Sequence, residues 1–104
     1  MAATRFLVVY IERKKDIPYE NLERRMNSAL DWYRLREHLW ILYTNNSADT
    51  WQLRLEPFRE KDGSVFICRL DVTERQGWMD ESFWKWFRSA ENRPSLPRLA
   101  QTDD

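Results

Sequence analysis

The sequence predicts a single α+β domain, in which four strands form one antiparallel sheet and two helices cover one of its faces. Segments of strand length and segments of helical period occur in the order strand, helix, strand, strand, helix, strand, and an aromatic helix follows. A chain of 104 residues, 42% hydrophobic and 33% charged, suits one folded domain with one ordinary core. We place this domain at residues 1–91 and expect a disordered tail at residues 92–104, which contain two prolines and few apolar residues.

The first strand and the first helix occupy the N-terminal third of the chain. Residues 6–11, FLVVYI, form a continuous apolar run, which is typical of a buried central strand. The charged stretch ERKKD follows, and Asp16 and Pro18 suit the start of a helix as cap and first-turn residue. From Tyr19 to Leu30, apolar side chains recur on one side at about 3.6 residues per turn, which predicts an amphipathic helix.

Residues 31–44, DWYRLREHLWILYT, are too many for one ordinary strand. We predict a hairpin with arms at 31–36 and 39–44 and a turn at Glu37 and His38. The second arm is apolar on both of its faces, so it also reads as a central strand.

The second half of the domain begins at Ser47, which suits the cap of a helix that Pro57 ends near Glu56. EKDGS predicts a turn, and VFICRLD at 65–71 predicts the last strand. Within this strand we expect Cys68 to be a small core residue.

This order of elements is that of the ferredoxin-like fold, βαββαβ, in which the first and third strands are central. Those are the strands with two apolar faces. Because two helices cover only one face of the sheet, either the C-terminal aromatic segment or a second copy of the protein must cover the other.

The aromatic segment GWMDESFWKWF offers a packing face at helical spacing. Phe83, Trp86 and Phe87 share one side of the helix, and we expect them to pack within the fold. Trp84 lies off that side. We expect an interface between subunits, formed by Trp84, Trp78 and Leu53.

Charge and composition exclude several functions. Seventeen Lys and Arg balance seventeen Asp and Glu, so no global field draws the chain to nucleic acid or to anionic lipid. The cluster Arg13, Lys14 and Lys15 predicts weak nucleic-acid binding at most. Phe6, Tyr10 and Tyr43 could stack bases as in RNA-recognition domains, but the signature of those domains is absent.

The location we expect is the cytoplasm, without a membrane association. Cys68 is the only cysteine, so no internal disulfide calls for an oxidising compartment. The N-terminal apolar run is too short for a signal-peptide core or a membrane span.

Catalytic candidates are few. His38, the only histidine, is interpreted as a structural or solvated residue of its turn. Glu12 and Asp16 are weak candidates for holding magnesium together with their copies in a second subunit, although a solvated loop is the interpretation we favour. No spacing of ligands predicts a metal site, two glycines exclude a glycine-rich phosphate-binding loop, and we expect no cofactor.

Several short features follow one another in a recognisable order. These are VVY in the first strand, YENL in the first helix, Trp32, WILYT, SAD with Leu55, and GW followed by Phe83 and Trp84 or Trp86. Over residues 5–88 the chain thereby resembles the small bacterial proteins labelled SinR family, which are not the helix-turn-helix repressor of that name. These are similar in turn to the CRISPR-associated adaptor nucleases and the virulence-associated D ribonucleases. The resemblance implies a ferredoxin-like homodimer.

In the nucleases of that wider group, an acidic residue directly follows the first strand, commonly after a tyrosine. Two such carboxylates, one per subunit, would hold a metal ion that activates water. Here Ile11 follows Tyr10, and alternation along the strand turns Glu12 to the face opposite Ile11. We therefore expect a non-catalytic homodimer that binds protein or nucleic acid. The alternatives are an atypical metal-dependent ribonuclease using Glu12 or Asp16, and a structural subunit that docks on another protein.

Overall fold

The computed structural model describes residues 3–92, which form an α+β fold with one four-stranded sheet and three α-helices. The elements are β1 (Arg5–Ile11), α1 (Tyr19–Met26), β2 (Asp31–Arg36), β3 (Leu39–Thr44), α2 (Ala48–Leu55), the 3₁₀ turn η1 (Glu56–Phe58), β4 (Val65–Leu70) and α3 (Glu81–Glu91). Of the expected tail, Asn92 is the C-cap of α3. Residues 93–104 lie outside the described part of the chain.

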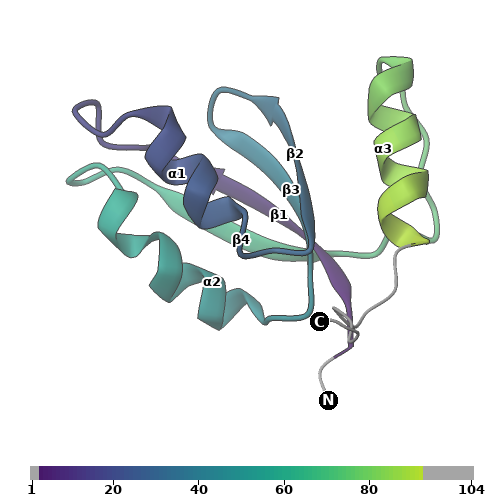
Figure 1. Cartoon of the computed structure of the whole chain (residues 1–104), viewed down its shortest axis with the longest axis horizontal. Helices are drawn as coiled ribbons and strands as arrows, with labels where there is room; N and C mark the ends of the chain where they lie inside the picture. The colour runs from purple at the N-terminus through teal and green to yellow at the C-terminus, as the bar shows by residue number, and fades with distance from the viewer. Residues whose placement is uncertain (1–2, 93–104) are drawn as a thin grey trace.

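The strands lie in the order β2-β3-β1-β4, and all neighbouring strands are antiparallel. β1 and β3 are therefore central, as their two apolar faces predict. The element order and the strand order are consistent with the ferredoxin-like arrangement. In Figure 1, α1 and α2 lie on one side of the sheet and α3 lies on the other.

The main core lies between the sheet and the helices α1 and α2. Its side chains are at most 1% exposed and come from both central strands and both helices: Leu7, Val9, Ile11, Leu22, Met26, Trp40, Leu42, Trp51 and Leu55. The buried indole Nε1 of Trp51 donates to Oγ1 of Thr44 at 3.1 Å, which satisfies both polar groups inside the core.

The helix ends differ in part from the prediction. Ser47 caps α2 by accepting a hydrogen bond from the Thr50 N–H, as predicted. α1 ends at Met26 rather than at Leu30, because the Leu30 N–H already donates to the carbonyl of Tyr43 in β3. The expected cap at Asp16 is also wrong, since Pro18 occupies the N-cap position in extended conformation.

α3 packs on the second face of the sheet and forms a smaller core there. Phe6, Ile41, Tyr43, Phe83, Phe87 and Ala90 are buried in this cluster. The predicted burial of Phe83 and Phe87 is confirmed. Trp86 is only half-buried, so its predicted burial is correct only in part.

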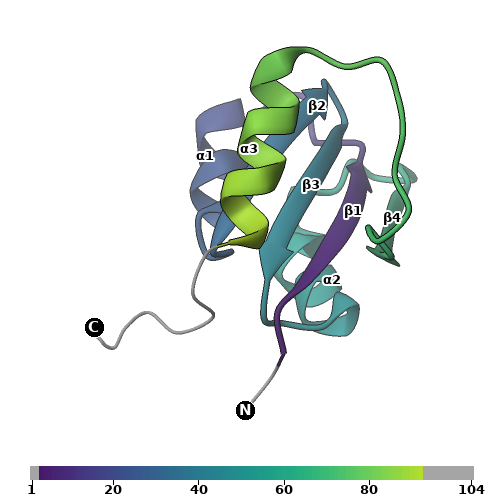
Figure 2. The ribbon, with the colours of Figure 1, turned by 90° about the vertical axis from the view of Figure 1, so that its right-hand side faces the viewer.

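α3 covers only part of this second face. Figure 2 shows it in front of β2 and β3, while β1 and β4 lie beside it. On β4, Phe66 is 60% exposed, and Cys68 is exposed as well. The prediction that Cys68 is a core residue is therefore wrong. β4 is an edge strand, and Cys68 points to the part of the face that α3 leaves uncovered.

Candidate functional site

The end of β1 carries Glu12, one of the two weak catalytic candidates. Ile11, the residue directly after Tyr10, is 1% exposed and belongs to the main core. Its side chain packs beneath the sheet and offers no ligand. Glu12 is the first carboxylate after the strand, and it lies half-buried at the strand end.

Both carboxylate oxygens of Glu12 accept hydrogen bonds from neighbouring parts of the chain. Oε2 accepts from the Tyr10 hydroxyl at 2.6 Å, and Oε1 accepts from the Ser64 N–H at 2.7 Å. The main chain adds a hydrogen bond from the Glu12 N–H to the carbonyl of Ser64 at 3.0 Å. Glu12 therefore ties the end of β1 to the segment that enters β4.

The loop that follows η1 is shaped to reach Glu12. The Glu60 N–H donates to the carbonyl of Glu12 at 2.7 Å, and Asp62 adopts a left-handed conformation with φ 63°. At Gly63, a Cβ would lie 2.9 Å from the Glu60 carbonyl oxygen and 3.3 Å from Cβ of Glu12. Glycine is needed here because the backbone passes this close to its neighbours.

These contacts set the protonation of the pair. The hydrogen bond from Tyr10, followed by that from Ser64, holds the pKa of Glu12 below its ordinary value. The same hydrogen bond raises the pKa of Tyr10, because the tyrosine must give up its proton beside a carboxylate. At neutral pH the stable state is a neutral tyrosine that donates to an ionised glutamate. A carboxylate with a lowered pKa is a weak general base.

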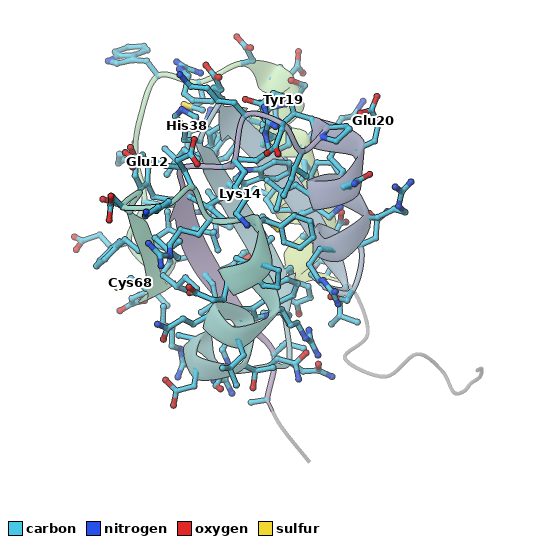
Figure 3. The ribbon with its side chains drawn as sticks, turned by 90° about the vertical axis from the view of Figure 1, so that its left-hand side faces the viewer. Glu12, Lys14, Tyr19, Glu20, His38 and Cys68 are labelled. Carbon is cyan, nitrogen blue, oxygen red and sulfur yellow. The ribbon has the colours of Figure 1, made fainter. Side chains whose placement is uncertain are left out.

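His38 lies beside this pair, in the turn between β2 and β3 where the sequence predicts it. Figure 3 shows Glu12 and His38 close together at one end of the sheet. The carbonyl of His38 accepts from the Ile11 N–H at 2.9 Å, and its ring meets that of Tyr10 edge to face at 6.1 Å. These contacts support the structural interpretation of this histidine.

Asp16 is exposed in the loop between β1 and α1. In the same described range, no group of three or more His, Cys, Asp and Glu could hold a metal ion. The structure thus places Glu12 at the half-buried end of β1 and Asp16 in an exposed loop.

The basic cluster after β1 is divided by the fold. The Arg13 guanidinium donates to the carbonyls of Lys14, at 2.8 Å, and of Ile17. It also lies 3.7 Å from the centre of the Tyr19 ring. Lys14 is half-buried, and Lys15 is exposed. Only part of the predicted basic cluster faces the solvent.

A second guanidinium reaches the same tyrosine. Arg34 of β2 lies 4.0 Å from the centre of the Tyr19 ring, whose hydroxyl donates to Glu37 at 2.9 Å. This group of cations around an aromatic ring joins the first loop to the β2–β3 hairpin. It gives Arg13 a structural role that its place in a run of charges did not reveal.

The residues expected at an interface lie in different environments. Trp78 is 100% exposed and Leu53 is 77% exposed. Trp84 is half-buried and packs in its own chain, with its ring 5.1 Å from that of Phe83. Phe66 was missed by the sequence analysis. Its position two residues before Cys68 in a strand places both side chains on one face, and that spacing could have identified them as a pair.

No protein-family model, no curated protein and no solved structure matches the chain. The relation to the SinR-family proteins therefore stays a prediction. Within residues 3–92, every helix is too short or too polar to span a membrane.

Proposed function

We propose that this protein is a non-catalytic, homodimeric binding protein with a ferredoxin-like fold, related to the SinR-family proteins that it resembles. Through them it would be related to the CRISPR-associated adaptor nucleases without sharing their reaction. This proposal rests on the environments of Ile11 and Glu12, the two residues that follow Tyr10. Ile11 is a core residue, and Glu12 is a bridge between β1 and the entry to β4.

A metal-dependent nuclease needs a carboxylate that is open to a metal ion or able to take a proton from water. Glu12 fits the role of general base poorly, because its pKa is lowered. Each of its oxygens also accepts a hydrogen bond that ties the side chain to Tyr10 and Ser64. The alternative ribonuclease using Glu12 or Asp16 is therefore not the function we favour.

A protein partner fits the surface better than nucleic acid does. Three large apolar side chains are well exposed: Leu53, Phe66 and Trp78. Of these, Phe66 lies beside the exposed Cys68 on the face that α3 leaves uncovered, and an exposed apolar surface of this kind is typical of protein interaction sites. The net charge is zero, and Arg13 is held by contacts within the chain. With Cys68 as its single cysteine, the protein suits the cytoplasm.

A cleavage assay tests the absence of catalysis. Purified protein is incubated with single-stranded RNA with and without magnesium, alongside Glu12→Ala and, as a matched control, Asp16→Ala. We expect no magnesium-stimulated cleavage by any of the three proteins. Robust cleavage by the wild type that is lost in Glu12→Ala and kept in Asp16→Ala would overturn the proposal and establish Glu12 as catalytic.

A further inference from the structure

The two edges of the sheet differ in how they are protected against further strand pairing. At the β2 edge, the register shifts between Arg34 and Arg36, and β2 carries three charged residues. Irregularities and charges of this kind keep an edge from pairing with another chain. β4 pairs with β1 in regular register, contains no proline and has Arg69 as its only charged residue. The β4 edge therefore lacks the usual protection.

The direction of the backbone groups of β4 follows from the hydrogen bonds at the strand ends. The Glu12 N–H donates to Ser64, while the Ile11 N–H donates to His38 on the other side of β1. Bonded and non-bonded pairs alternate in an antiparallel ladder. Residues 66, 68 and 70 therefore bond to β1, and Val65, Ile67 and Arg69 turn their N–H and C=O groups to the open edge.

These outward groups have almost no partners in the part of the chain that is described. The only hydrogen bond found there is a weak one, from Sγ of Cys68 to the carbonyl of Arg69 at 3.4 Å. An edge strand with three unpaired residues and an exposed Phe66 beside them is ready to accept another strand.

We infer that β4 is the dimer interface, where it pairs antiparallel with β4 of a second copy about a twofold axis that passes Ile67. This inference rests on the homodimer of the proposed function and specifies its interface. In this register Ile67 lies opposite the partner's Ile67, and Val65 lies opposite the partner's Arg69. All outward groups pair, which gives about six hydrogen bonds between the strands.

The side chains of β4 are complementary to themselves in this register. Arg69 meets an apolar residue rather than its own copy, so no like charges face each other. On the face that α3 leaves uncovered, Phe66 lies opposite the partner's Cys68, and both side chains lose exposure to water. If the twofold axis passed Cys68 instead, fewer of the outward N–H and C=O groups of β4 would pair with β4 of the second copy. The self-complementary pattern is what favours a second copy over an unrelated strand.

Cysteine cross-linking tests the interface and its register. Phe66 and the partner's Cys68 form a non-hydrogen-bonded pair, whose Cα atoms lie about 4.5 Å apart, within the range for a disulfide of about 4.4–6.8 Å. Two copies of Cys68 are diagonal neighbours about 7–8 Å apart, which is too far for a bridge. Phe66→Cys should therefore form a covalent dimer under mild oxidation. Wild type and Phe66→Cys/Cys68→Ser should remain uncrosslinked on a non-reducing gel.

Because the side chain of Phe66 is 60% exposed, its replacement leaves both cores intact. Sedimentation of Phe66→Cys under reducing conditions distinguishes a wrong interface from the absence of a homodimer. A reduced dimer that does not cross-link refutes the β4 interface and leaves the proposed homodimer in place. A reduced monomer, with wild type also a monomer, refutes both. Cross-linking of wild type as efficient as that of Phe66→Cys overturns the register at Ile67.

Discussion

Phe6 of β1 and Phe87 of α3 meet edge to face, with their ring centres 4.8 Å apart. This contact joins the second face of the sheet to the helix that covers it. Phe83 of the same helix meets Tyr33 of β2 in the same way at 5.4 Å. The aromatic segment thus forms a core within its own chain, and α3 is an integral part of the domain.

Phe87→Ala should destabilise the fold strongly. Phe87 is 4% exposed, and truncation of a buried large aromatic residue costs about 3–5 kcal/mol. We expect a large drop in the free energy of unfolding, measured by denaturant titration. Lys85→Ala is the matched control, because Lys85 is exposed on the same helix and its truncation should leave the unfolding curve unchanged. Equal unfolding curves for Phe87→Ala and wild type would contradict the packing of α3.

The ion pair of Arg75 and Glu91 should fasten the end of α3 to the segment before it. Arg75 donates to both oxygens of Glu91, at 3.0 and 2.7 Å, and its guanidinium lies 4.5 Å from the centre of the Phe87 ring. Each of the two charged side chains is 32% exposed. We expect Arg75→Gln to lower the free energy of unfolding by about 1 kcal/mol at neutral pH and low salt.

The loss of unfolding free energy in Arg75→Gln should depend on pH, and the direction follows from the pKa of Glu91. The hydrogen bond from Arg75 lowers the pKa of Glu91 in the folded protein. The pair therefore stabilises the fold fully above the ordinary value of 4.5, and its contribution is lost as the pH falls through the lowered pKa. Unfolding curves of wild type and Arg75→Gln should converge in acid. A difference that grows on acidification would contradict the pair.

Glu12 should titrate below an ordinary glutamate because of Tyr10. Carbon NMR of the side-chain carboxyl, followed against pH, should give a pKa for Glu12 below its ordinary value of 4.5. Tyr10→Phe removes the first of its causes, so the pKa should move back toward that value. An unchanged Glu12 pKa in Tyr10→Phe would show that the bridge does not form in solution.

Nucleic-acid binding should be weak and should fall steeply with salt. Lys15 is the exposed member of the basic cluster, whereas Arg13 is held against Tyr19. We expect Lys15→Ala to reduce any binding of single-stranded RNA, measured by fluorescence anisotropy at low salt, without affecting stability. Tight binding at physiological salt with a shallow salt dependence would instead indicate that aromatic side chains stack on the bases.

The arrangement of the sheet could be predicted because strands that are buried on both faces are continuous apolar runs in the sequence. The runs at 6–11 and 39–44 are apolar on both faces, and β1 and β3 are the central strands. The cap at Ser47 and the end of α2 before Pro57 depend on neighbouring residues only, so local chemistry was sufficient.

What could not be predicted depends on contacts between distant segments. The apolar pattern continues past Met26, but Leu30 is drawn into a hydrogen bond with β3. The alternation of side chains along β4 shows which residues share a face, but it does not show how far α3 extends across that face. Cys68 was therefore wrongly assigned to a core. The role of Glu12 required knowing that the chain returns to it at Ser64.

Sedimentation equilibrium of the wild-type protein tests the proposed homodimer most directly. At concentrations on the order of tens of micromolar, we expect a species of twice the chain mass, in equilibrium with monomer on dilution. A protein that sediments as a monomer throughout this range would contradict the account.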